Sequence, residues 1–410
     1  PFPAAIVDTL TVLDAVRGGT LGLATEPAAP GSAPCPEFHL TQLPSLPATL
    51  APGGAPITFQ ANYGPLDVGT DSGAIAISVV QGQSITYLVG LQGAGSTTGT
   101  QVDTFTQDLI PKADVLLVVD DSCSMQDKQN ALAANFANFI QYAQSANVDY
   151  RIGVTTTTIG GTECVPIFGC FTPDSRGPNG HLVQDGPTQL KWVTPQTPQV
   201  SSVFSRLVNV GTNGGTEQPL AGATLALTPP AISNENAGFL RDEANLAVVV
   251  ISDASDQSPR PVTYYQDLLV NVKGYQRLSY FTFSAVTPRL ANPPSNCSYD
   301  ESGANSSRYN PITSYTGGVQ DEICNSNWAQ TLQNLGQTAF GYRTHFYLEN
   351  QPQGAVVVRI DGLVVPQCPA PTPGAQCWTY DAMPPAVRFA NAPAPGDELE
   401  FEYTQNCYGP

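Results

Sequence analysis

One short stretch constrains the fold of this chain more than any other. The apolar run Asp114–Val119 predicts a buried strand, and Asp120, Ser122 and Ser124 follow it at alternate positions of one tight loop. Their carboxylate and hydroxyl oxygens are hard ligands, which suit Mg²⁺, Mn²⁺ or Ca²⁺. The stretch therefore predicts a metal site at the carboxyl end of a strand, with an ordinary Asp/Ser turn as the alternative.

The spacing of these three residues is the pattern D-x-S-x-S, and Met125 comes directly after it. In this respect the chain resembles the von Willebrand factor A (VWA) family, in which the pattern belongs to a metal-ion-dependent adhesion site (MIDAS). The resemblance implies two further ligands, a threonine from a second loop and an acidic residue from a third.

The chain offers both implied ligands in the right order. A glycine-rich loop before the helical stretch at Gln218 supplies Thr216, with Thr212 as the alternative. A second apolar strand is followed by Asp253, and Asp256 competes with it as the third-loop carboxylate. Loops at the carboxyl ends of parallel strands meet at one edge of the sheet, so we expect these residues to converge.

Strands and helices alternate through the middle of the chain. Apolar residues at Leu132, Phe136, Phe139 and Ile140 follow the helical period, which predicts one helix over Gln126–Ala146. The further elements expected are a strand Tyr150–Thr156, helices Val200–Val208 and Val262–Val272, a strand Leu278–Val286, a helix Asn327–Ala339 and a strand Arg343–Leu348. This alternation predicts an α/β fold with a doubly wound, mostly parallel sheet, which is the form of the VWA fold.

Several segments outside the D-x-S-x-S loop resemble a group of VWA proteins of the bacterial cell envelope, over roughly residue 101 to the C-terminus. They are Gly153–Thr157, Phe239–Arg241, Ser252–Pro259 and Tyr315–Gly318. The resemblance implies an extracellular or cell-surface location on a bacterium, in the periplasm or outer envelope.

The length of 410 residues predicts more than one domain. Short β-rich segments at Phe38–Leu50, Ile57–Tyr63, Gly73–Val80 and Ile85–Leu91 predict a β-sandwich over residues 1–97, which resembles the immunoglobulin-like ASH and HYDIN modules. Residues 98–112 are expected to form a linker, residues 113–348 a VWA domain, and residues 349–410 a small antiparallel β domain. In the last of these, the aromatic Trp378 and Tyr380 are expected in the core rather than on a binding face.

Cysteine usage and composition point to a secreted chain rather than to a cytosolic protein with reduced thiols. Only 12% of residues are charged, and Pro and Gly number 37 each. Of the nine cysteines, six are candidates for disulfides, in the pairs Cys164 with Cys170, Cys297 with Cys324, and Cys368 with Cys377. Cys35, Cys123 and Cys407 remain, and we expect Cys123 to be buried or disulfide-linked rather than a reactive thiol.

Charge and motifs disfavour two classes of function. The formal net charge of −18 disfavours binding to nucleic acid. Catalysis is disfavoured because His39, His181 and His345 are scattered and no hydrolase, P-loop or zinc-protease motif occurs. No secretory signal or membrane-spanning run is evident, and since the chain begins at Pro1 we expect it to derive from a longer precursor.

The sequence thus predicts a metal-dependent adhesion or protein-binding module with no enzymatic activity. Under the VWA resemblance, Ser122, Ser124 and Thr216 bind the cation directly, and Asp120 and Asp253 bind it directly or through water. An open position on the ion then captures an Asp or Glu of a partner. The alternative is a structural subunit of a surface assembly or filament, in which the β modules contact neighbouring subunits and the metal only rigidifies loops.

Overall fold

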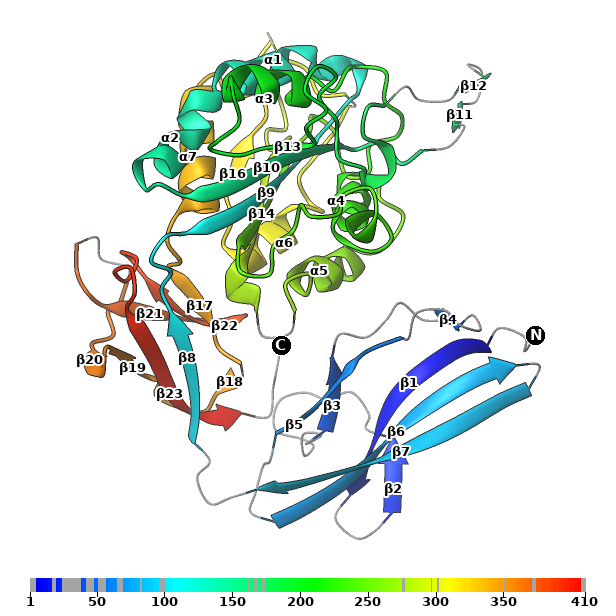
Figure 1. Ribbon diagram of the computed structural model, residues 1–410, viewed down its shortest axis with the longest axis vertical. Helices are drawn as coiled ribbons and strands as arrows, with labels where there is room; N and C mark the ends of the chain where they lie inside the picture. The colour runs from blue at the N-terminus through cyan, green and yellow to red at the C-terminus, as the bar shows by residue number, and fades with distance from the viewer. Residues whose placement is uncertain are drawn as a thin grey trace.

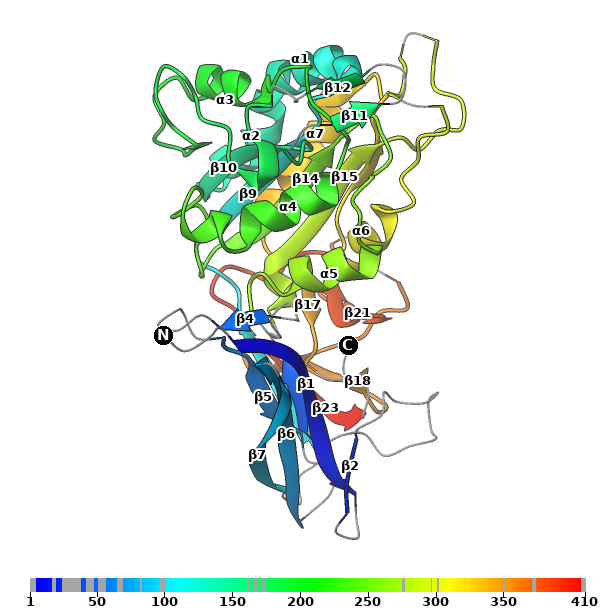
Figure 2. The ribbon, with the colours of Figure 1, turned by 90° about the vertical axis from the view of Figure 1, so that its right-hand side faces the viewer.

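The structure is a computed structural model. It describes residues 5–406 except 17–19, 24–37, 42–47, 51–56, 65–68, 82, 96–99, 161–162, 166–168, 172–174, 275–276, 296, 301, 350 and 371–373. Figure 1 and Figure 2 show an α/β unit in the upper half of the molecule and two β-rich units below it.

A six-stranded sheet forms the centre of the α/β unit. Its spatial order is β13-β10-β9-β14-β15-β16, and all neighbours are parallel except β10 and β13. The strands are β9 (Lys112–Val119), β10 (Asp149–Thr156), β13 (Trp192–Val193), β14 (Asn245–Ile251), β15 (Phe281–Thr287) and β16 (Gln320–Glu322). The order of strands along the chain reverses at β9, which confirms the predicted doubly wound, mostly parallel sheet.

Helices cover both faces of this sheet (Figure 1). On one face, Val115, Leu117 and Val119 of β9 belong to a core with four helices, and on the other Leu116 and Val118 belong to a core with three. The first group is α1 (Gln126–Ala134), α2 (Phe136–Ser145), α3 (Val200–Val208) and α7 (Trp328–Phe340). The second is α4 (Pro219–Leu227), α5 (Val262–Val270) and α6 (Asn310–Thr316). Burial of successive residues on opposite faces explains why this strand reads as continuously apolar.

Two predicted elements differ from the structure in this unit. The single helix expected over Gln126–Ala146 is broken at Asn135, which has φ −103° and ψ 15° and separates α1 from α2. The strand expected at Arg343–Leu348 is β17 (His345–Tyr347), and it pairs with β22 (Pro385–Phe389) rather than with the central sheet. The sixth position in the central sheet belongs instead to β16, whose three polar residues gave no strand pattern.

The C-terminal β unit draws strands from both sides of the α/β unit. β8 (Thr100–Thr106) pairs antiparallel with β23 (Glu398–Asn406), although residues 98–112 were expected to form a linker. The other strands are β17 and β22, together with β18 (Gln351–Pro352), β19 (Val357–Ile360), β20 (Leu363–Val365) and β21 (Trp378–Ala382). Trp378 is buried in the core of this unit, and its indole N–H donates to the Val365 carbonyl at 2.9 Å. The α/β unit is therefore inserted between β8 and the remaining strands of the C-terminal β unit.

The N-terminal region is antiparallel β structure. One sheet contains β1 (Ala5–Val16), β2 (Thr20–Leu23), β4 (Ala48–Leu50), β6 (Gly69–Gln81) and β7 (Gln83–Gly95). A second contains β3 (Phe38–Thr41) and β5 (Gln60–Tyr63). Ile75 of β6 packs with Leu40 of β3 and with Phe59, which brings the two sheets together around a small core. An immunoglobulin-like topology for this region stays a prediction.

Two of the three expected disulfides are present. Cys297 bonds to Cys324 and Cys368 to Cys377, with Cα atoms 5.8 Å and 5.7 Å apart. Cys164 and Cys170 lie opposite each other in the hairpin of β11 (Glu163–Val165) and β12 (Gly169–Phe171), but their side chains lie outside what the structure describes. Cys35 and Cys407 are likewise outside the described residues.

Candidate metal centre

The first loop of the site begins where β9 ends. The Asp120 N–H donates to the Ile251 carbonyl at 3.0 Å, which fixes the end of β9 against the end of β14. The Asp120 carboxylate then accepts from the Ser122 N–H at 2.8 Å, an Asx turn that reverses the chain into the short helix η1 (Cys123–Met125). The turn holds the carboxylate and the following serines on one side of the loop.

Hydroxyl and carboxylate oxygens from the first and third loops meet at this edge. Ser122 Oγ and Ser124 Oγ are 3.2 Å apart, and Ser124 Oγ donates to Asp253 Oδ1 at 3.0 Å. Ser252 Oγ donates to Asp120 Oδ2 at 2.6 Å, so the third loop also orients the first carboxylate. The structure thus brings together four of the five residues predicted as ligands.

The second loop is attached to the first through its glycines. The Gly214 N–H donates to the Asp121 carbonyl at 2.8 Å, and the Gly215 N–H donates to Thr158 Oγ1 at 2.9 Å. Thr216 follows directly and is half-buried, between Gly215 and the buried Glu217. The loop that carries the fifth predicted ligand is therefore anchored against the loop that carries the others. The alternative, Thr212, is also half-buried but lies before this anchored segment.

Two buried carboxylates next to the predicted ligands were not anticipated. Asp121 Oδ1 accepts from the hydroxyls of Thr157 at 3.2 Å and Thr158 at 2.9 Å. The Thr157 hydroxyl also contacts Glu217, whose side chain is 2% exposed. Their positions beside Asp120 and Thr216 in the sequence were the available signal, but only the fold shows that they are buried.

Negative charge is concentrated at this edge. Burial, and after it the charge of Asp253, raises the pKa of Asp120 to about 6. Burial and the charge of Asp120 raise the pKa of Glu217 well above its usual value. Burial also raises the pKa of Asp253, against the lowering effect of Lys128, whose Nζ lies 3.0 Å from Asp253 Oδ2. Shifts in this direction are expected where buried carboxylates lack sufficient positive charge.

Asp256, the competing third-loop carboxylate, has a different role. Its Oδ2 pairs with Arg308 Nε at 2.7 Å, and its Oδ1 accepts from the Leu220 N–H at 3.1 Å at the start of α4. The third-loop carboxylate that faces Ser124 is therefore Asp253, which accepts from the Ser124 hydroxyl, whereas Asp256 is held by Arg308 and the start of α4.

Cys123 was expected to be buried or disulfide-linked, and the expectation of burial is wrong. Its side chain is exposed, and no disulfide joins it to another described cysteine. The Asx turn directs Asp120 and the flanking serines inward, so the residue between those serines faces outward.

Comparison with known proteins gives only distant structural likeness. No protein-family model matches the chain, and no curated protein matches it. Among solved structures, proximal thread matrix protein 1 (PTMP1) from the mussel byssus is 12% identical over 60% of this chain and 51% of that chain, with a TM-score of 0.37. A structure of the same mussel protein with a zinc-occupied MIDAS motif is 12% identical, with a TM-score of 0.35.

The pilus adhesin SpaC from Lactobacillus rhamnosus GG, in an open conformation, is 10% identical over 90% of this chain and 42% of that chain, with a TM-score of 0.36. This chain thus spans about half the length of the mussel protein and less than half of the adhesin. With TM-scores this low, the likeness establishes neither the fold nor the function of this chain.

The donor set at this edge fits a hard divalent cation. Within the described part of the chain, no three His, Cys, Asp or Glu side chains form a metal-binding group, so a purely carboxylate or thiolate cage is not built here. Adjacent serine hydroxyls together with buried carboxyl groups provide the mixed oxygen ligands that Mg²⁺ or Mn²⁺ accepts, and a cation would relieve the crowding of acidic groups that raises the pKa of Asp120.

Proposed function

We propose that the chain is a metal-dependent adhesion or protein-binding module of the VWA type. The observation that carries the proposal is the contact of Ser124 with both Ser122 and Asp253, which lies 129 residues further along the chain. Asp120, Ser122, Ser124, Thr216 and Asp253 would hold Mg²⁺, Mn²⁺ or Ca²⁺ at the switch in strand order. When bound, the cation supplies a positive centre that attracts an Asp or Glu carboxylate of a partner.

The residues of this chain have distinct tasks in the proposal. The two serine hydroxyls are neutral ligands, so they hold a cation without cancelling its charge. Ser252 and the Ser122 N–H orient the Asp120 carboxylate through their hydrogen bonds of 2.6 Å and 2.8 Å. Asp121 fixes the position of the second loop, because its backbone carbonyl accepts from the Gly214 N–H and its side chain accepts from the Thr158 hydroxyl, which in turn accepts from the Gly215 N–H.

The placement of the site supports capture of a partner. The C-terminal β unit contacts the α/β unit at the opposite edge, where the Tyr347 N–H donates to Ser279 Oγ at 2.9 Å. A cavity of about 270 Å³ at that edge is lined by the first residues of β14 and β15 and by Arg343 and His345. The metal edge, at the other end of the strands, is therefore directed away from the C-terminal β unit (Figure 2).

We propose an extracellular location for this function, on the surface or in the envelope of a bacterium. The support is the pair of disulfides at Cys297–Cys324 and Cys368–Cys377, since such bonds persist in oxidising compartments. None of the described helices has the length and apolar character needed to cross a bilayer. We assign no enzymatic role.

Calorimetric titration with Mg²⁺ and Mn²⁺ tests the metal site. We expect the wild-type chain to bind one ion, and Asp120→Ala and the double variant Ser122→Ala/Ser124→Ala to lose binding while circular dichroism reports an intact fold. Asp242→Asn changes an exposed carboxyl group at the opposite edge and is the matched control. Unchanged metal affinity in both site variants would refute the proposal.

Retention on immobilised peptides tests the capture of acidic groups. Peptides that carry one Asp or Glu should retain the wild-type chain in Mg²⁺ and release it in EDTA, and matched Asn or Gln peptides should retain none. Metal binding without selective retention would leave the ion with a structural role only.

One observation favours the structural alternative, a subunit of a surface assembly. β20 is the edge strand of its sheet, and Leu363 and Val364 on it are 75% and 66% exposed. Exposed apolar edge strands pair readily with other chains. If assembly is the function, Leu363→Ser/Val364→Ser should abolish concentration-dependent association in sedimentation velocity, whereas chelation of metal should leave it unchanged.

A further inference from the structure

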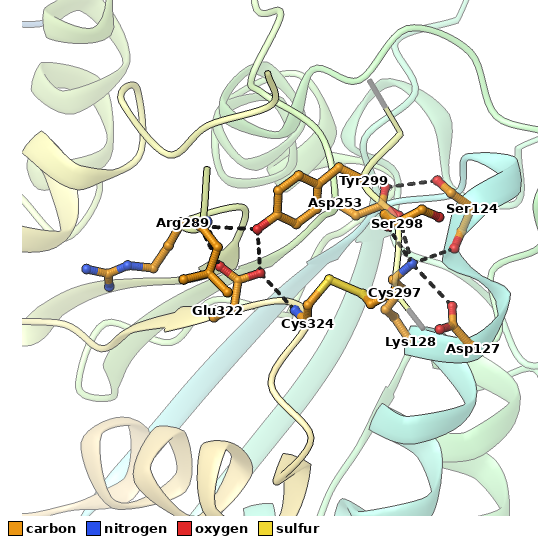
Figure 3. The surroundings of a disulfide bond; sticks show 11 residues. Ser124, Asp127, Lys128, Asp253, Arg289, Cys297, Ser298, Tyr299, Glu322 and Cys324 are labelled. Carbon is orange, nitrogen blue, oxygen red and sulfur yellow. Dashed lines mark hydrogen bonds and ion pairs between the residues drawn. A yellow bond between two sulfur atoms is a disulfide. The ribbon is translucent and has the colours of Figure 1, made fainter. Parts of the chain in front are cut away.

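A buried lysine lies within the candidate metal centre. Lys128, in the first turn of α1, is 3% exposed, and its Nζ lies 3.0 Å from Asp253 Oδ2. The same ammonium donates to the Ser124 carbonyl at 2.9 Å and to the Ser298 carbonyl at 3.2 Å. Figure 3 shows it between the first loop, the third loop and the disulfide-linked segment.

The segment over Lys128 is held by several contacts. Cys297 is bonded to Cys324, next to β16, and the Asp300 N–H donates to the Asp253 carbonyl at 3.1 Å. The Tyr299 hydroxyl donates to Glu322 of β16 at 2.8 Å (Figure 3). These contacts place the Ser298 carbonyl over the ammonium, so the position of Lys128 is determined by the fold and not by free rotation of an exposed chain.

A buried ammonium paired with a candidate metal ligand has a definite electrostatic effect. It neutralises part of the charge of Asp253, which the divalent cation would also use. Two positive charges in one poorly solvated site repel each other, and this repulsion is strong where the effective dielectric constant is low. A lysine with a purely structural role would instead hold Asp253 in place and thereby support metal binding.

We propose that Lys128 is a resident counter-cation that sets the metal affinity of the site. It shares Asp253 with the divalent ion and so lowers the affinity for that ion. It also keeps the third loop in place when no metal is bound. This inference rests on the proposed function, because it concerns the same site.

Titration of the full chain with Mn²⁺ alone, with free Mn²⁺ counted by electron paramagnetic resonance, tests the inference. We expect Lys128→Met to bind Mn²⁺ at least about tenfold more tightly than the wild type, because the repulsion is removed. Lys112→Met is the matched control: Lys112 pairs with Glu243 at 3.0 Å on the surface, at the opposite end of β9, and its loss should leave the affinity unchanged.

A second variant covers the case in which Lys128→Met does not fold without metal. Lys128→Gln keeps hydrogen-bond donors at the position but removes the charge, and it too should bind Mn²⁺ more tightly. The melting temperature of each variant in EDTA should fall below that of the wild type and recover in excess Mn²⁺, because Asp253 then regains a positive partner.

The outcomes separate the two proposals. If the wild type binds Mn²⁺ and neither Lys128 variant binds it more tightly, the inference is wrong and the metal site stands. If only the Lys128 variants bind, the lysine excludes the metal from the native site, so the inference holds in a stronger form while the proposed function fails. If no form binds Mn²⁺, the proposed function fails and the inference fails with it.

Discussion

Gly214→Ala tests directly whether the second loop belongs to the site. The Gly214 N–H donates to the Asp121 carbonyl, so this residue sets the distance between the second loop and the first. A Cβ at position 214 would lie 2.4 Å from Asp121 Oδ1 and 2.8 Å from the Asp121 carbonyl oxygen. Because one of these atoms belongs to the backbone, a rotation of the Asp121 side chain does not relieve the clash.

The size of the effect follows from these distances. The contact with the backbone oxygen, at 2.8 Å, falls about 0.6 Å below an ordinary van der Waals contact, so the second loop must move outward by a similar amount. Overpacking of this kind costs about 1–3 kcal/mol of stability. The movement also displaces Thr216, the predicted ligand, and a displacement of more than about 0.5 Å is enough to impair a binding site. We therefore expect Mn²⁺ affinity to fall at least about tenfold.

Urea denaturation followed by circular dichroism measures the free energy of unfolding, and paramagnetic resonance measures Mn²⁺ affinity. Gly186→Ala is the matched control, because a Cβ there has no neighbour within 4 Å. We expect it to lower neither the free energy of unfolding nor the Mn²⁺ affinity. If Gly214→Ala retains wild-type stability and metal affinity, the second loop is not packed against Asp121 as described, and the argument for Thr216 as a ligand is refuted.

Three further predictions concern the stability of the fold. Replacing Cys297 and Cys324 with Ser should lower the free energy of unfolding by about 3 kcal/mol in urea denaturation, because the bond closes a loop with a sequence separation of 27. Phe204→Ala should lower the free energy of unfolding by about 3–5 kcal/mol, since this ring stacks on Phe136 at a centroid distance of 3.8 Å inside the core. A loss below about 1 kcal/mol would contradict that packing. Burial, and after it the charge of Arg388, lowers the pKa of His345 to about 4, so the fold favours the neutral imidazole. The stability that the neutral imidazole contributes is complete above about pH 6.5 and is lost as the pH falls toward 4, with a loss of about 1–2 kcal/mol at pH 5. His345→Gln should remove that part of the pH dependence, which denaturation curves at pH 7.5 and pH 5 measure.

The sequence was most informative where one physical signal dominates. β9 and β14 are buried on both faces, so they read as continuous apolar runs, and the polar residues after them mark the carboxyl edge of the sheet. The helix α3 was predicted with its observed bounds, Val200–Val208, because its apolar residues keep the helical period. Asp120, Ser122, Ser124 and Asp253 follow from the same reasoning, since each lies just after a strand of this kind.

Other elements depend on partners that are distant in the sequence. β16 is polar and short, and β8 is a strand because β23 pairs with it from the other end of the chain. Asp121, Glu217 and Lys128 are polar residues that a sequence alone places on the surface, and only the packing of three loops shows that they are buried. For such residues the sequence shows the charge, whereas their burial is reported by no local pattern and is seen only in the fold.

The α/β unit is inserted between β8 and β17 of the C-terminal β unit, and this bears on how the two candidate functions divide between the units. The chain enters the unit at the start of β9 and leaves it through α7, which leads into β17 beside the amino ends of β14 and β15. Both connections therefore lie at the edge opposite the candidate metal centre, and neither covers it. A metal that only rigidifies loops does not require the site to lie away from these connections. A site that captures a partner does require it, because the partner needs access to that edge of the sheet. Substitutions on the exposed edge of β20 should accordingly leave Mn²⁺ affinity unchanged, because the two surfaces lie on different units at opposite ends of the central strands.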